Sequence, residues 1–228
     1  MTPASLNHIY RLVWNEVTQT FVAVCEHARG RGKRSRAGSA VGAAVLLGAL
    51  SGAQAQGLPP NALPTQGQIA AGQGSIGQAG NQTTVNQASN KLVINWGSFD
   101  IGSGARVQFN QPGSSAIALN RVVGGQPSTI LGQLGANGQV WLLNPGGIVF
   151  GRSAQVNVGG LVASTLAMTD ADFLAGQYRL SGNSQGRILN QGQIQAAGGV
   201  VALIAPQVRN EGQITTPGGS TQLTAAEA

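Results

Sequence analysis

The stretch ILNQGQIQAAGGVVALIA, residues 188–205, is followed almost at once by a second copy, VRNEGQITTPGGSTQLTA, residues 208–225. The two copies align without a gap along their whole length. Within each copy, apolar and polar residues alternate as they do in β-strands, and a glycine pair separates the alternating runs. A repeat of about 20 residues with strand-like alternation indicates a solenoid in which each copy forms one coil.

The aligned positions predict where the side chains of a coil lie. Asn190 and Asn210 should occupy a turn, where an asparagine side chain can bond backbone groups. Three apolar pairs should point inward and stack between coils: Ile188/Val208, Ile194/Ile214 and Leu203/Leu223. We therefore predict an all-β fold, a parallel β-helix with coils of about 20 residues. A β-sandwich with chance repeats is the weaker alternative, because the copies match without gaps.

The composition agrees with a turn-rich, ordered β protein. Only 9% of the 228 residues are charged and 35 are glycine, whereas a typical globular domain carries about 25% charged residues. The net charge of +6 is unevenly placed, because residues 1–36 contain six bases and two acids and the rest of the chain contains seven bases and five acids. The main part of the chain therefore lacks the clustered bases of a nucleic-acid surface, and we predict no nucleic-acid partner.

The N-terminal segment, up to Ala55, has the pattern of an export leader. The basic run RGRGKRSR, residues 29–36, precedes an apolar run over residues 40–50. That run is too short to span a membrane, which takes about 20 apolar residues. Ala53 and Ala55 fit the small-x-small pattern of signal cleavage sites, and we place the cut after Ala55. The predicted parts are an extended leading region (1–34), a signal core with its cleavage site (35–55) and a mature domain (56–228).

Removal of the leader would also remove the residue types on which many catalytic and metal sites depend. His8, Cys25 and His27 all lie in the leader, so the mature domain has no thiol and no imidazole. Thiolate nucleophiles, histidine bases and Cys/His metal sites then have no donors. The mature acids do not recur as a facing pair at the coil spacing: Asp100, Asp170, Asp172, Glu211 and Glu227. We predict a protein that is not an enzyme, with no catalytic residues, no metal and no cofactor.

One segment, STLAMTDADFLAG at residues 164–176, breaks the strand pattern. Thr169 is a suitable N-cap, Asp170 and Asp172 suit the first turn of a helix, and Gly176 suits its end. We predict a short extra helical turn here. A calcium site at the two aspartates is less favoured, because calcium takes about six or more oxygen ligands and no third carboxylate is nearby in the sequence.

A second segment, VWLLNPGGIVFG at residues 140–151, places a glycine-rich turn between two apolar runs. It lacks the lysine and the following helix of a phosphate-binding loop. Pro145 suits the second position of a turn, and a glycine can take the positive φ after it. We therefore predict a type I or type II turn over Asn144-Pro145-Gly146-Gly147, at a corner between two strands of the solenoid wall.

Two parts of the chain resemble a known family. The leader resembles the extended signal peptide region of very large secreted proteins of Gram-negative bacteria, and the matching residues are Asn7, Ile9, Tyr10, Arg11, Val13, Trp14, Asn15, Val22, Ala23, Val24, Glu26 and 28–33. Four stretches resemble the haemagglutination-activity domain of the filamentous haemagglutinin family, the secretion domain of two-partner-secreted exoproteins: INWGSFDIG (94–102), the run from FNQPG to GIVFG (109–151), VGGLVAST (158–165) and TDADFLAGQY (169–178).

The resemblance implies a right-handed parallel β-helix with an N-terminal cap. It also implies recognition by a dedicated outer-membrane β-barrel transporter after export by the Sec machinery. The family turn motif Asn-Pro-Asn-Gly-Ile is matched at Asn144, Pro145, Gly147 and Ile148, while Gly146 replaces the second asparagine. These five positions are the predicted transporter-recognition and turn motif. Because glycine and asparagine both tolerate a left-handed conformation, we expect the turn to survive the replacement.

The function that the resemblance implies is secretion targeting. We expect an adhesin-like virulence exoprotein, secreted or displayed at the cell surface, whose secretion domain templates the folding of the rest outside the cell. The chain is expected to be truncated, with any binding to a host surface or to carbohydrate in a missing C-terminal region. The alternative is a stand-alone secreted β-helix module that binds carbohydrate or a surface through its polar ladders of Gln, Asn and Thr.

Overall fold

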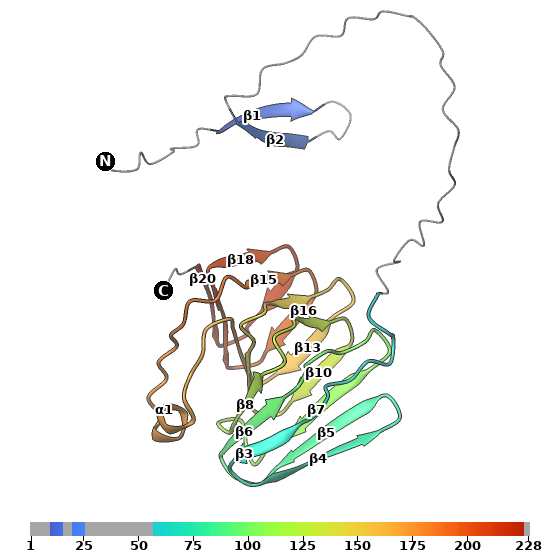
Figure 1. The fold of residues 1–228 in the computed structure, drawn as a ribbon, viewed down its shortest axis with the longest axis vertical. Coiled ribbons are helices and arrows are strands. Elements are labelled where there is room, and N and C mark those ends of the chain that lie inside the picture. Colours follow the sequence, from blue (N-terminus) through green and yellow to red (C-terminus); the bar gives the residue numbers. More distant parts are fainter. Residues whose placement is uncertain (1–9, 16–19, 26–56, 226–228) are drawn as a thin grey trace, which may run out of the picture. The chain divides into compact units, whose positions relative to one another are not determined.

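The computed structural model describes residues 10–15, 20–25 and 57–225, in two compact units, Met1–Gly52 and Ala53–Ala228. In the first unit, β1 (Tyr10–Asn15) and β2 (Thr20–Cys25) pair as antiparallel strands. The predicted cleavage residues Ala53 and Ala55 lie outside the described residues. The second unit is a stack of strands (Figure 1) that forms three sheets.

Sheet I has seven strands. In spatial order they are β4 (Gly74–Ala79), β5 (Gln82–Gln87), β7 (Arg106–Asn110), β10 (Gln133–Ala136), β13 (Gln155–Val158), β16 (Gln193–Ala196) and β19 (Gln213–Thr215). All neighbours are parallel except β4 and β5, which form an antiparallel hairpin at one end. Its outward positions are amide-rich, and Gln133, Gln155 and Gln193 stack in register.

Sheet II also has seven strands. In spatial order they are β3 (Gln68–Ala71), β6 (Lys91–Trp96), β8 (Ile117–Val122), β11 (Gln139–Leu143), β14 (Gly160–Ser164), β17 (Val200–Ala205) and β20 (Ser220–Ala225). Here too the first strand, β3, is antiparallel to its neighbour, and the pairing contains a bulge. Together β3 and the β4–β5 hairpin form the predicted N-terminal cap.

Sheet III is shorter, with four parallel strands. They are β9 (Ser128–Ile130), β12 (Ile148–Phe150), β15 (Arg187–Asn190) and β18 (Gln207–Asn210). The chain runs from sheet I to sheet II to sheet III and then returns to sheet I one coil further on. The predicted parallel β-helix is therefore confirmed.

The period of the sequence repeat holds in the last coils, because Gln193 pairs with Gln213 and Val200 pairs with Ser220. Towards the N-terminal end the coils are longer than the repeat, and Arg106 pairs with Gln133. The extra residues lie in the corner loops between strands. The interior strand positions keep their spacing while the corners vary in length.

The predicted inward positions form the core. Ile188, Ile194 and Leu203 are buried and stack on Val208, Ile214 and Leu223 respectively. Complete burial of such a side chain stabilises the fold by about 1.5–3 kcal/mol. Leu223 is 48% exposed because β20 is the outermost described strand of sheet II, so its inward side chains are covered from one side only.

The glycine pairs of the repeat let successive corners touch. A Cβ atom added at Gly199 would overlap the carbonyl oxygen of Gly159, and one added at Gly219 would overlap that of Gly199. Coils one strand spacing apart, about 4.8 Å, leave no room for a side chain at this corner. The glycines therefore set how closely the coils stack.

The short helix is also present. α1 (Asp170–Ala175) is capped by Thr169, whose hydroxyl accepts a hydrogen bond from the Asp172 backbone, and it ends at Gly176 with φ of 78°. It lies between β14 and β15, to one side of the stack (Figure 1). Within the described ranges, no helix has both the length and the apolar character needed to cross a membrane.

Candidate functional site: the Asn144 corner

Asn144 occupies the corner at which the chain leaves β11 for β12, and it is completely buried. Its side-chain Nδ2 donates to the Gln126 carbonyl oxygen and to Ser128 Oγ, both at 2.9 Å, in the coil before. Its backbone N–H donates to the Ser164 carbonyl oxygen at 2.9 Å, in the coil after. One residue thus bonds its own coil to both neighbours.

The turn itself is closed by the same residue. The carbonyl oxygen of Asn144 accepts from the Gly147 N–H at 3.0 Å, and its side-chain Oδ1 accepts from the Gly146 N–H at 2.8 Å. The positive φ lies at Gly147, at 111°, and not at Gly146. A type II turn needs its positive φ at the third residue, so the type II alternative and the placement of the left-handed residue directly after Pro145 are wrong.

Gly146 is constrained by contact and not by its φ angle. A Cβ atom there would lie 2.8 Å from the Gly125 carbonyl oxygen and 3.0 Å from the backbone nitrogen of Pro127. The expectation that asparagine and glycine are interchangeable here, because both tolerate a left-handed conformation, therefore rests on the wrong reason. An asparagine at this position requires the 125–127 backbone to move outward by a few tenths of an ångström.

The motif offers little side-chain surface. Asn144, Gly147 and Ile148 are buried, Gly146 is half-buried and Pro145 is exposed. The structure places the five predicted residues together at one corner, because the two strands of one coil meet there. The amide of Asn144 is used entirely inside the protein.

One residue bonds the motif from outside, and a half-buried acid bonds the sheet III strand of the coil before. Ser184 Oγ donates to the Pro145 carbonyl oxygen at 2.6 Å, from the segment that precedes β15. Asp100 accepts a hydrogen bond from the Thr129 N–H at 2.8 Å, at the start of sheet III. Burial raises the pKa of the Asp100 carboxyl above its usual 3.8, and that hydrogen bond partly opposes the rise. Ser184 was not identified from the sequence, and Asp100 was considered there only as one of the mature acids.

A second buried asparagine lies at the corner between sheets III and I. Asn190 Nδ2 donates to Asn210 Oδ1 at 2.7 Å, and Asn190 Oδ1 accepts from the Gly192 N–H at 3.1 Å. This confirms for Asn190 the prediction that the asparagine side chain bonds turn backbone, whereas the side chain of Asn210 bonds that of Asn190. The same arrangement explains why both corners need an amide, which donates and accepts at once.

Thr165 occupies the position equivalent to Asn144 in the next coil. Both residues come directly after the paired strands β11 and β14, which end at Leu143 and Ser164. Its hydroxyl is buried and has no hydrogen-bond partner. Leaving a buried hydroxyl unpaired costs about 1–3 kcal/mol. The sequence does not mark this position.

The acidic candidates are used structurally. Asp170 pairs with Arg121 at 2.6 Å, and Asp172 accepts from the Thr169 hydroxyl at 2.7 Å. The Gln191 amide that bonds Glu211 lowers the pKa of that carboxyl. Among residues 57–225, no three His, Cys, Asp or Glu side chains come close enough to hold a metal ion.

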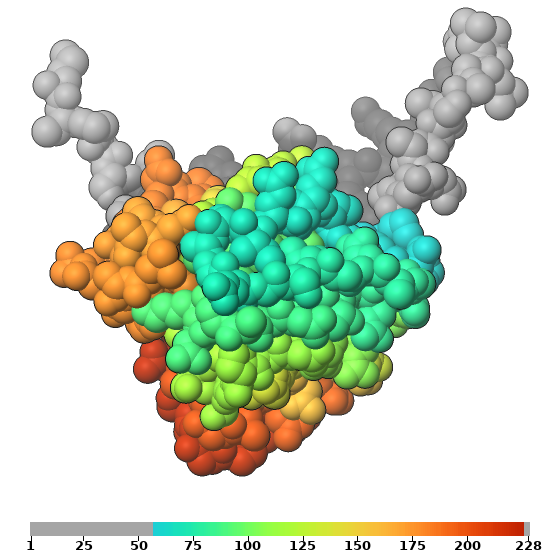
Figure 2. Space-filling model, turned by 90° about the horizontal axis from the view of Figure 1, so that it is seen from below, coloured from blue at the N-terminus to red at the C-terminus, as the bar shows by residue number. Residues whose placement is uncertain are grey.

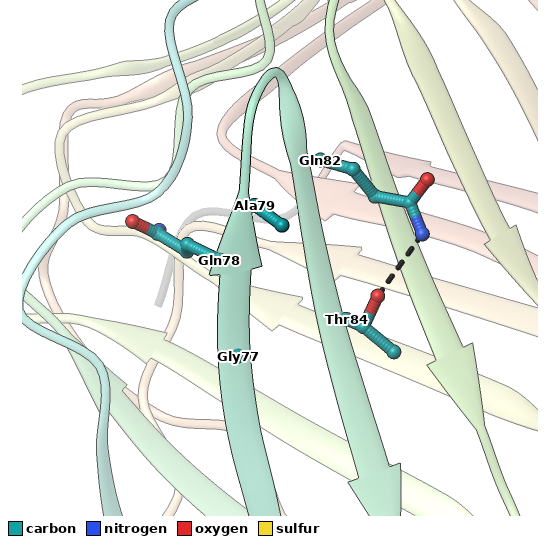
Figure 3. Close-up of a pocket in the computed structure, with 5 residues that line it drawn as sticks. All are labelled: Gly77, Gln78, Ala79, Gln82 and Thr84. Atoms are coloured by element: carbon teal, nitrogen blue, oxygen red, sulfur yellow. Dashed lines mark hydrogen bonds between the residues drawn. The ribbon is translucent and has the colours of Figure 1, made fainter.

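The hollow at the cap of the stack has no charged side chain in its lining. This hollow of about 360 Å³ lies at the β4–β5 hairpin (Figure 3) and is lined by Gly77, Gln78, Ala79, Gln82 and Thr84. Gln82 Nε2 donates to Thr84 Oγ1 at 3.0 Å across its rim. These side chains are uncharged at neutral pH, so the hollow offers hydrogen-bond donors and acceptors.

Comparison with known proteins gives the family. Residues 55–228 match the family described as the TPS secretion domain, and residues 7–55 match the Extended Signal Peptide of Type V secretion system. A Heme/hemopexin-binding protein of Haemophilus influenzae strain Rd is 37% identical over 139 residues, 61% of this chain and 15% of that protein. Another protein of that name from Haemophilus influenzae is 41% identical over 110 residues, 48% of this chain and 12% of its own length.

The fold has a solved counterpart. The crystal structure of the HMW1 secretion domain from Haemophilus influenzae aligns with a TM-score of 0.69 and 33% identity, over 72% of this chain and 45% of that chain. This chain therefore spans less than half of each of these relatives. An extended signal peptide followed by a TPS domain marks a protein that a Gram-negative bacterium exports to its surface or to the medium. This chain belongs to the TPS secretion domain family of two-partner-secreted exoproteins.

Proposed function

We propose that residues 57–225 direct export by acting as a folding template, and that their partner is a cognate outer-membrane β-barrel transporter. The observation that carries the proposal is the position of Asn144, which bonds the coil before it and the coil after it. The Sec machinery is expected to take the leader, and cleavage after Ala55 is expected to release the domain.

The template role follows from the way in which each coil is held. A coil contacts only its neighbours. A folded coil therefore offers the next coil unpaired backbone hydrogen-bonding groups, inward apolar side chains to pack on, and a glycine corner that allows close approach. Asn190 and Asn210 add a side-chain ladder in the same direction. Folding can then advance one coil at a time as the chain leaves the transporter. Each added coil makes it less favourable for the chain to move back into the transporter.

We propose that the Asn144 corner serves this process through geometry. Its amide has no surface to offer a partner, because its bonds go to Gln126, Ser128 and Gly146. Loss of the amide leaves buried backbone and hydroxyl groups unpaired, at about 1–3 kcal/mol for each group. Pro145 is the exposed residue of the turn and is the one that a transporter could read directly.

A secretion assay with the cognate transporter tests the proposal. The chain carrying Asn144→Ala should reach the medium at a several-fold lower level, and the purified variant domain should unfold at lower urea concentration. Asn157→Ala is the matched control, because Asn157 is exposed on the outer side of β13. The control variant should be secreted at the level of the unmodified chain.

Pro145→Ala separates a structural corner from a recognition surface. If this variant keeps its urea midpoint but is no longer secreted, the transporter reads the turn surface and the template account of the corner is wrong. Secretion that is unchanged when the transporter is absent would overturn the partner itself.

The activity of the exoprotein beyond this domain is a separate question. The two Haemophilus relatives are named for binding heme and hemopexin. Histidine and cysteine, two common axial ligands of heme iron, occur in this chain only at His8, Cys25 and His27. Met168 and Tyr178, two further residues of ligating types, both pack in the cluster on sheet II. We therefore assign no heme site to residues 57–225, and we propose that any binding to a host surface or carbohydrate belongs to other parts of the exoprotein.

A further inference from the structure

The outer side of sheet II is apolar in its middle, unlike the amide-covered outer side of sheet I. Val93, Leu119, Trp141 and Val162 stack in register across four strands. Val93 and Leu119 are completely buried and Trp141 is 7% exposed. Side chains on the outer wall of a solenoid meet water unless something covers them, so this face depends on a cover.

The cover is a single segment between β14 and β15, residues 167–181, here called the strap. It contributes Met168, Phe173 and Leu180 to the cluster formed with the sheet II face. The Tyr178 ring also packs edge-to-face on Trp141, with ring centroids 4.7 Å apart. In Figure 2 the orange atoms, which include those of α1, lie beside teal and green atoms of the N-terminal half of the stack.

The strap is closed at its base and bound at both ends of α1. Ala167 and Ser181 exchange two backbone hydrogen bonds, of 2.8 and 3.0 Å, which tie the two ends of the loop together. Lys91 Nζ donates to the Phe173 and Leu174 carbonyl oxygens at 2.9 and 2.8 Å. A cation suits the C-terminal end of a helix, where the last carbonyl groups have no helical partner.

Arg121 makes the second anchor, at the other end of the helix. Its Nη2 donates to the Met168 carbonyl oxygen at 2.9 Å and to Asp170 Oδ1 at 2.6 Å. The two anchors lie on neighbouring strands, Lys91 on β6 and Arg121 on β8. Both strands precede the strap in the chain, as does every strand whose face the strap covers.

We propose that the strap is a latch that closes after the coils have stacked, with Lys91 and Arg121 as its anchors. Coils that form from the N-terminal end carry a bare apolar face until residues 167–181 are available. Closure then buries that face and bonds the insertion to strands laid down much earlier. Its use in export, which rests on the proposed template function, is to lock the first coils so that the exported chain does not slide back.

Native-state hydrogen exchange with mass spectrometry tests the latch on the compact unit Ala53–Ala228. In the unmodified unit, the Phe173 and Ser181 amides should exchange through a local opening that leaves the β6 and β8 amides protected. Exchange of strap and strand amides only together, in one global opening, would overturn the latch.

The double variant Lys91→Met/Arg121→Met should speed strap exchange at least about tenfold, because each cation makes charge-assisted hydrogen bonds. It should also increase the binding of an apolar dye to the uncovered face. Arg209→Met is the matched control, since Arg209 is 77% exposed on β18, away from the strap. Equal exchange in the double variant and the control would also overturn the proposal.

Secretion of the same variants separates the latch from the function on which its use rests. With the cognate transporter, the double variant should reach the medium at a lower level than the Arg209→Met control. Normal secretion of a double variant with a fast-exchanging strap would overturn the role in export. Transporter-independent export of the unmodified chain would overturn the proposed function, while the exchange result would still decide whether the strap is a latch.

Discussion

Lys91 Nζ lies 2.9 Å from the carbonyl oxygen of Phe173, although 82 residues separate the two in the chain. The ammonium group also faces the Phe173 ring, with 5.7 Å from Nζ to the ring centroid. A lysine on an early strand thus binds the C-terminal end of a helix that belongs to a later coil. This contact turns the outer side of sheet II into a second, smaller core.

Replacement of Lys91 by methionine should destabilise the domain. The apolar stem of the side chain is kept, but two charge-assisted hydrogen bonds to carbonyl groups are lost, at about 1–3 kcal/mol. Urea unfolding followed by fluorescence should report the loss, because Trp141 lies in the same cluster. Lys91→Arg should retain most of the stability, and a methionine variant as stable as the unmodified domain would contradict the anchoring role.

Gly199→Ala should be strongly destabilising. The added methyl group overlaps the Gly159 carbonyl oxygen, so two coils must separate locally, and overpacking of this kind typically costs about 1–3 kcal/mol. Gly77→Ala is the control, since no atom lies within 4 Å of a Cβ built there. Equal urea midpoints for the two variants would argue against close corner contact.

Thr165→Val should leave stability unchanged or raise it by about 1 kcal/mol, because it removes a buried hydroxyl that has no partner and keeps the shape of the side chain. The equivalent change at Thr83 should destabilise, since its buried hydroxyl accepts from Gln78 Nε2 at 3.1 Å. Thermal unfolding of the two variants measures the contrast. A large loss from Thr165→Val would mean that the hydroxyl has a partner after all.

Asp100 should make the domain less stable as pH rises from acid. The folded pKa of its carboxyl is raised above 3.8, so the folded state holds the proton more tightly than the unfolded chain. The stabilisation by protonation is therefore present at low pH and is lost as pH rises through the folded pKa. Asp100→Asn should be more stable than the unmodified domain near neutral pH, and the difference should shrink towards pH 4 and below, as measured by melting temperature.

Cleavage after Ala55 predicts a secreted chain that begins at Gln56. Intact mass and N-terminal sequencing of the secreted product measure this directly. Ala55→Leu should slow processing and leave precursor in the cell, because signal cleavage sites need a small residue there. A mature product that begins elsewhere would contradict the assigned boundary.

The repeat carried most of the information about the wall of the solenoid. Leu203 and Leu223 occupy the same position in the two copies and are paired in the fold, and the Asn190 side chain bonds turn backbone at Gly192 as expected. Short-range rules also identified α1, because Thr169 and Gly176 are local signals of its two ends. These features depend on residues that lie close together in sequence or that recur in register.

Other features depend on contacts that the sequence does not display. Gly146 is confined by the backbone of the preceding coil, so its role could not be deduced from the turn residues alone. The strap's cover of sheet II needs Lys91 and Phe173 to meet, and neither position has a distinctive pattern. The lengths of the corner loops follow no periodic pattern in the sequence. The greater length of the coils near the N-terminal end could therefore not be predicted from the repeat.

The strap also gives the stack a landmark. A pile of nearly equivalent coils has no inherent origin, since each backbone edge accepts the next strand in much the same way at any level. Lys91 and Arg121 occur on two particular strands, and the helix that they hold belongs to one particular coil. A coil that joined the stack one level too high or too low would place the strap out of reach of both cations. This one insertion therefore fixes the register of the coils in an otherwise repetitive structure.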